Sequence, residues 1–214
     1  MSVFEALNHL GSVVSINGSI MMVLGDAGIA ATWKGVTNAV NDEDLEAGGS
    51  DWARCLDALN WGTDLPFARV TCDGGELLTI RIHVSGGGYV EVFGVGEALV
   101  LIEACWSDVE HLADRDFLDY VKRPCSADAT DAGLVEVTAG AIALLPAPSS
   151  GERVPEALAN LGPAGSAQFA TESEWAMVVE LPTRRYRVRI EDQVEGPWGL
   201  GARAIVEPEP AVQG

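Results

Sequence analysis

Alternating apolar and polar residues predict that most of this chain forms β-strands. In the segment 77–84, Ile80 and Ile82 share one face while Arg81 lies on the other, which is the period of a half-buried strand. Two further apolar runs follow glycine-rich turns. Together the runs predict an antiparallel meander over residues 77–84, 89–93 and 98–104.

Two more patterns predict strands near the ends of the chain. Residues 13–24 hold two apolar runs around Asn17-Gly18, a dipeptide that favours the positive φ angles of a type I′ turn, and they predict a β-hairpin. Towards the C-terminus, Arg185, Arg187 and Arg189 alternate with the apolar residues Tyr186, Val188 and Ile190, and residues 202–206 predict a closing strand. The three arginines would share one strand face, where they could pair with the chain's own acids or with an anion.

Helical periodicity is confined to short segments. The longest is 108–121, where apolar residues recur every three or four positions behind a capping box of Ser107 and Glu110, and Pro124 follows its end. Shorter helices are predicted over residues 3–10, 51–59 and 155–161. The predicted fold class is therefore α+β, mainly antiparallel β, with a few short helices.

A weak internal repeat is visible in two places. Residues 18–23 resemble residues 140–145, and residues 64–66 resemble residues 180–182. This predicts a single domain, 1–214, whose two weakly related β-rich halves, about 12–107 and 133–208, are linked by the acidic helix 108–121. Chance similarity between apolar strands is the alternative.

Composition makes this a folded, strongly acidic protein. With 214 residues, of which 48% are hydrophobic, the chain can bury roughly 70% of its unfolded surface, which excludes intrinsic disorder. The 32 acidic residues outnumber the 13 Lys and Arg, for a net charge of −19. Nucleic acid is therefore disfavoured as a partner, because its phosphates would be repelled.

The sequence predicts a soluble cytoplasmic protein that does not associate with membranes. The N-terminus lacks the basic residues of a secretory signal, and no apolar run reaches the length of a membrane span. The four cysteines form no C-x-x-C pair and suggest free thiols of a reducing compartment, at positions 55, 72, 105 and 125.

Motifs for catalysis and metal binding are missing from the sequence. There is no phosphate loop, no serine elbow and no H-E-x-x-H. The acidic run at 41–44 lacks the ligand order of a calcium loop, and His111 and Cys125 carry no local signature of a base and nucleophile. We therefore expect no enzyme activity, no cofactor and no metal.

Acidic residues cluster in the loop 42–46 and on the helix 108–121, and these clusters predict a docking surface for a basic partner. Trp33 lies in the same half and could serve as an aromatic anchor. A solvated surface is the alternative explanation. The predicted partner-binding residues are Asp42, Glu43, Asp44, Glu46, Asp108, Glu110, Asp114, Asp119 and Trp33.

Several short segments carry a family resemblance. They are a glycine-led apolar strand at 16–23, a W-x-G at 33–35 and a D-W-x-R-x-C segment at 51–55, with related strands at 140–146 and 181–188. Together they resemble immunity protein family twenty-one of bacterial polymorphic toxin systems. Departures are Ser19 and Ala141, which stand where that family usually has proline, and the long acidic helix.

The resemblance implies a protein that binds and neutralises a cognate toxin domain, and many such toxins are basic nucleases. One alternative is a small-molecule binding module, or an enzyme, with a pocket between the two β-rich halves. Another is an assembly protein that forms a homo-oligomer through an open sheet edge.

Overall fold

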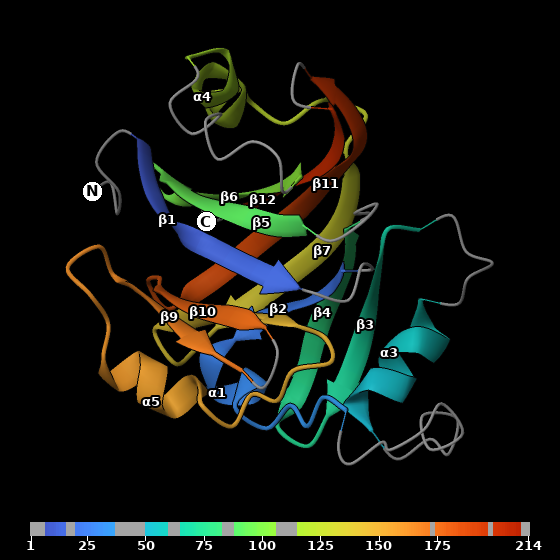
Figure 1. Ribbon diagram of the computed structural model, residues 1–214, viewed down its shortest axis with the longest axis vertical. Coiled ribbons are helices and arrows are strands. Elements are labelled where there is room, and N and C mark those ends of the chain that lie inside the picture. Colours follow the sequence, from blue (N-terminus) through green and yellow to red (C-terminus); the bar gives the residue numbers. More distant parts are fainter. Residues whose placement is uncertain are drawn as a thin grey trace.

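The computed structural model describes residues 7–15, 20–36, 50–59, 65–82, 88–105, 115–171, 174–196 and 199–210. In this part of the chain, twelve antiparallel strands form one sheet that curls into a nearly closed barrel (Figure 1). Four short helices lie outside it, α4 at one end and the others at the opposite end: α1 (Ala27–Ala30), α3 (Asp51–Ala58), α4 (Arg115–Lys122) and α5 (Val154–Ala159). The predicted β-rich class is confirmed.

The strands are β1 (Leu7–Ser15), β2 (Ile20–Asp26), β3 (Phe67–Cys72), β4 (Gly75–Ile82), β5 (Gly88–Val95), β6 (Ala98–Cys105), β7 (Thr130–Val137), β8 (Ala141–Pro146), β9 (Ser166–Ala170), β10 (Trp175–Glu180), β11 (Arg184–Gly196) and β12 (Gly199–Pro208). Their order in the sheet is β3-β4-β2-β8-β10-β1-β5-β6-β12-β11-β7, and β9 pairs with β10 beside this path. The pair Val14 and Trp175 joins β1 to β10.

The first six strands and the last six make the same pattern of pairings. In the first set β1 pairs with β5, β5 with β6, and β4 with both β2 and β3. In the second set β7 pairs with β11, β11 with β12, and β10 with both β8 and β9. The sets meet where β2 pairs with β8, with Val23 opposite Leu145, and where β6 pairs with β12, with Val100 opposite Ile205. They also meet at the single pair between β1 and β10.

A bulge beside a positive-φ glycine interrupts both β1 and β7. Gly11 has φ 137° and Gly133 has φ 86°, a region that L side chains rarely adopt. The carbonyls on either side of each glycine accept hydrogen bonds from a distant strand. The donors on β9 are Ser166 to Leu10 and Gln168 to Ser12, and the donor on β3 is Arg69, to Ala132 and Leu134.

The predicted hairpin at 13–24 is wrong, although both of its strands exist. The strands β1 and β2 do not pair with each other, because β2 lies between β4 and β8. Residues 21–24 are buried on both faces of the sheet, and such a strand belongs in the middle of a covered sheet rather than in a hairpin at its margin. The Asn17-Gly18 turn lies outside the described residues.

The predicted meander is only half right. Strands β5 and β6 form a hairpin, but β4 pairs with β3 and β2 and not with β5. The alternation around Ile80 suggested one buried face, whereas residues 77–80 are all buried, so β4 is covered on both sides. The same alternation predicts that His83 lies on the face opposite Ile80, but His83 is outside the described residues.

The predicted helices fare unequally. Helices at 51–59 and 155–161 are confirmed as α3 and α5, but residues 7–10 of the predicted helix 3–10 belong to β1. Pairing of β1 with β5 overrides the weak local helical pattern. In α4, the predicted apolar stripe is buried at Phe117, Tyr120 and Val121. Residues 106–114, including the capping box, lie outside the described residues.

Apolar side chains form three clusters. The largest fills the barrel and includes Met22, Leu144 and Val188. A second lies between the outer face of the sheet and the helices α1, α3 and α5. A third lies beneath α4, where Phe93 contacts the ring of Phe117 at a centroid distance of 6.0 Å. Both faces of the central strands are thus removed from water.

Asp26 joins the two sets of strands. Its buried carboxylate accepts hydrogen bonds from the amides of Gly28 and Ile29, which caps α1, and from the amides of Thr138 and Ala139 ahead of β8, at 2.6 and 2.7 Å. Burial alone would raise the pKa of Asp26, but these hydrogen bonds outweigh it and the pKa lies below its usual value.

We expect Asp26→Ala to lower the free energy of unfolding by about 3 kcal/mol, because a helix cap is lost and buried amides lose their acceptor. Since the folded-state pKa is lowered, the carboxylate stabilises the fold above about pH 4 and loses this effect as the pH falls through the folded-state value. Urea titrations from pH 2.5 to 7 check both points. An equal pH dependence in Asp26→Ala and wild type would contradict the assignment.

Candidate functional site

The predicted acidic surface is only partly within the described residues. Asp119 lies on the exposed face of α4, where it pairs with Arg115 at 3.9 Å and Lys122 at 3.6 Å. Helix α4 contains two basic residues, Arg115 and Lys122, and two acidic residues, Asp116 and Asp119, so it carries no net negative charge. The other predicted acids lie outside the described residues: Asp42, Glu43, Asp44, Glu46, Asp108, Glu110 and Asp114.

Trp33 is a core residue, so the prediction that it anchors a partner is wrong. Its side chain is 1% exposed, and the indole N–H donates to the carbonyl of Ala147 at 2.9 Å. An indole packed among α1, α3 and β8 has no surface to offer. The sequence position beside acidic residues gave no information on burial.

A buried ion pair holds α4 against the barrel. Arg203 is 1% exposed and donates to the carboxylate of Glu191 at 3.0 Å and to the carbonyl of Val121 at 3.1 Å, at the C-terminal end of the helix. Its guanidinium also lies over the ring of Tyr120 at 5.0 Å. Burial raises the pKa of Tyr120 to about 12. The guanidinium of Arg203 therefore fixes α4 to the barrel. No sequence pattern indicated that this arginine would be buried.

The arginines of β11 pair with the chain's own acids. Arg185 contacts Glu209 at 3.1 Å, and Arg189 contacts Glu207 at 2.6 Å. Arg187 forms an ion pair with Asp131. These partners answer the question that the sequence left open, because the three guanidinium groups already have carboxylates beside them.

Glu91 is buried between two polar side chains. It is 2% exposed, accepts from Ser12 at 2.8 Å and forms a hydrogen bond with the His9 ring. Serine hydrolases need the histidine between serine and carboxylate. Here the carboxylate lies between the other two, so the order of the three groups differs from that of a serine-hydrolase triad.

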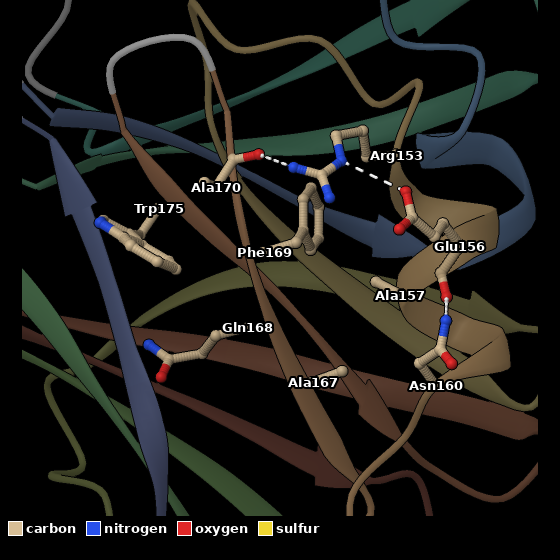
Figure 2. A pocket seen from close by; sticks show the side chains of 9 residues that line it. All are labelled: Arg153, Glu156, Ala157, Asn160, Ala167, Gln168, Phe169, Ala170 and Trp175. Carbon is tan, nitrogen blue, oxygen red and sulfur yellow. Dashed lines mark hydrogen bonds and ion pairs between the residues drawn. The ribbon is translucent and has the colours of Figure 1, made fainter.

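A surface groove of about 360 Å³ lies between α5 and β9 (Figure 2). Ala167 and Phe169 point from β9 toward the helix, while Gln168 and Trp175 lie on the other side of the strand. Arg153 closes one end, since it donates to the carbonyl of Ala170 at 2.7 Å. The lining is Arg153, Glu156, Ala157, Asn160, Ala167, Gln168, Phe169, Ala170 and Trp175.

Trp175 is the aromatic residue that the sequence analysis missed. It is 48% exposed, whereas Phe169 beside it is 6% exposed. An exposed tryptophan at a groove is typical of binding surfaces. The only sequence signal was its position at the start of an apolar strand, directly after Glu172-Ser173-Glu174.

Other chemistry is not evident in the described part of the chain. Its side chains include no group of three or more potential metal ligands. None of its helices has the length and apolar character to cross a membrane. No family model, curated protein or solved structure matches the chain. The resemblance to an immunity family therefore stays a prediction.

Two tryptophan substitutions test these placements. We expect Trp33→Ala to lower the free energy of unfolding by about 4 kcal/mol, because it leaves a cavity in the core and removes the hydrogen-bond donor of the Ala147 carbonyl. Trp175→Ala should cost less than about 1 kcal/mol, since half of the indole already meets water. Denaturant unfolding followed by far-UV circular dichroism measures both. Equal losses would show that the two burial assignments are mistaken.

Proposed function

We propose that this protein is an immunity protein that binds and neutralises a basic bacterial toxin domain and has no catalytic activity of its own. The observation that carries the proposal is how the chain uses its basic residues. All 13 Lys and Arg lie in the described part, and eleven of them contact an acidic side chain there: Lys34, Arg54, Arg69, Arg115, Lys122, Arg153, Arg184, Arg185, Arg187, Arg189 and Arg203.

The remaining two basic residues are also engaged. Arg81 donates to the carbonyl of Leu59, and Arg123 lies over the ring of Tyr120 at 5.2 Å. The surplus that gives a charge of −19 therefore belongs to carboxylates that the chain's own cations cannot neutralise. Such a field speeds the encounter with a basic protein and repels anionic competitors.

The proposed mechanism is substrate mimicry. In a nuclease toxin, basic residues bind the phosphates of the nucleic acid, and carboxylates of the inhibitor would occupy those positions. The described segments hold every Lys and Arg of the chain, so the segments 37–49 and 106–114 contain acids but no Lys or Arg. We propose these two segments as the contact region, with Asp119 at its margin, where its carboxylate is already shared with Arg115 and Lys122.

The proposal is tested by affinity capture. The tagged protein is incubated with lysate and secretions of its own host at low salt and at about 0.5 M salt, and bound proteins are identified by mass spectrometry. Recovery of one basic toxin domain that is retained mainly at low salt supports the proposal. A clean preparation with a bound small molecule and no protein partner would overturn it.

Charge reversal separates a local contact from the general field. Reversing Asp108, Glu110 and Asp114 to Lys should slow association with the toxin at least tenfold and flatten its salt dependence, measured by stopped flow. The control reverses three exposed acids elsewhere, Asp128, Glu136 and Glu180, which changes the net charge equally. If both triple variants associate at the same rate, the segment 106–114 is a solvated surface.

We also propose that the chain consists of two related β-rich halves. Support comes from the identical pairing patterns of β1–β6 and β7–β12, and from the glycine bulges at Gly11 and Gly133. Of the segments 18–23 and 140–145, which resemble each other in sequence, residues 20–23 and 141–145 lie in the central pair β2 and β8. The second resemblance gives no support, because residues 64–66 precede β3 whereas residues 180–182 precede β11.

Related halves predict that their order in the chain can be exchanged. If the halves are related by a two-fold axis, β6 corresponds to β12 and β7 to β1. The distance from the end of β12 to the start of β1 then equals the distance from the end of β6 to the start of β7, which residues 106–129 connect. A circular permutant opened between Ser126 and Ala127, with its old termini joined by about twelve Gly and Ser residues, should therefore fold.

We expect its unfolding midpoint to lie within about 10 °C of the wild-type value in scanning calorimetry. The control is the unopened chain with the same linker at its C-terminus. A permutant that lacks a cooperative transition, beside a control that unfolds normally, would contradict the two-half proposal.

A further inference from the structure

Strand β9 is an edge of the sheet with unused hydrogen-bonding groups. The amide of Thr171 donates to the Glu174 carbonyl and the amide of Glu180 donates to the Gly165 carbonyl, so odd-numbered residues of this strand bond to β10. The amide and carbonyl groups of Ser166, Gln168 and Ala170 consequently point away from β10, toward the groove.

Two of these outward carbonyls already have donors. Ser166 accepts from the amide of Gly162 at 2.9 Å, and Ala170 accepts from Arg153. Gln168 lies between them, and its main chain offers both a donor and an acceptor to the groove. The edge therefore has one complete pairing position, flanked by two further outward N–H groups.

From this geometry we infer that the groove binds an extended, basic segment of the partner as an added strand alongside β9. In strand addition, main-chain hydrogen bonds hold the ligand and alternate side chains enter pockets. One set of side chains would lie over the apolar floor of Ala157, Ala167 and Phe169. Small apolar residues suit those positions.

The side chains between them should be basic. Arg153 is already bonded to Ala170 and lies 3.4 Å from Glu156, whose side chain is 64% exposed, and Glu152 is exposed next to it. The rim of the groove thus has a surplus carboxylate, and the whole chain carries −19. This inference rests on the proposed function, because it takes the basic partner from there.

The test uses the full chain and a synthetic peptide, acetyl-Lys-Val-Lys-Val-Lys-Val-Lys-amide. Binding is followed by two-dimensional NMR of the ¹⁵N-labelled protein. We expect the largest shifts at the Gln168 and Ala170 amides and at the Trp175 indole. The same peptide with alternate amides N-methylated, which cannot form the strand pairing, should bind at least tenfold more weakly.

Two substitutions isolate the main-chain contact. Gln168→Pro removes the outward N–H, and proline is tolerated at edge positions whose N–H faces away from the sheet. Gln168→Ala keeps that N–H and removes only the side-chain bond to Ser12. We expect at least tenfold weaker peptide binding for Gln168→Pro and less than threefold for Gln168→Ala, with both variants folded by circular dichroism.

The outcomes separate this inference from the proposed function. Absence of peptide binding, equal binding of the N-methylated peptide, or equal effects of the two Gln168 variants would overturn it. A concentration-dependent dimer that Gln168→Pro abolishes would assign the edge to a second copy instead. If a captured toxin binds Gln168→Pro as tightly as wild type, the immunity proposal stands and strand addition fails.

Discussion

The pairing of β2 with β8 is the constraint on which the rest of the fold depends. Both strands are apolar on both faces, so neither can lie at the margin of a sheet without exposing a row of hydrophobic side chains. Placing them together at the centre fills the barrel on one side and leaves the other to be covered by α1, α3 and α5. Asp26 then ties the end of β2 to the segment ahead of β8.

The same constraint explains why local patterns predicted strands better than their partners. Sequence periodicity located the strands that became β5, β6, β11 and β12 and the helices α3 and α5. It failed where pairing is long-range. A turn such as Asn17-Gly18 indicates a hairpin, but the sequence does not show that the second strand, β2, pairs with β4 and β8 instead. It also passed over β9 and β10, whose short apolar runs lack a clear period.

Functional surfaces were harder to predict, for a related reason. Acidic residues could be counted from the sequence, but burial could not. Trp33, the predicted anchor, is buried, whereas Trp175, for which the sequence pattern predicted no role, is exposed. The edge of β9 follows from hydrogen-bond register alone, which no single-sequence pattern encodes. Net charge, in contrast, is read from the sequence without coordinates. What the structure added is that the basic residues are engaged within the chain.

Different side chains donate hydrogen bonds to the carbonyls at the two bulges, and this difference bears on how such a protein can evolve. Arg69 alone donates hydrogen bonds to both carbonyls around Gly133, whereas Ser166 and Gln168 each donate to one carbonyl around Gly11. A symmetric dimer must change both copies of a surface together, since one gene encodes them. A single chain with two matching sets of strands is free of that restriction, so one edge can acquire a new contact while the other keeps the barrel closed.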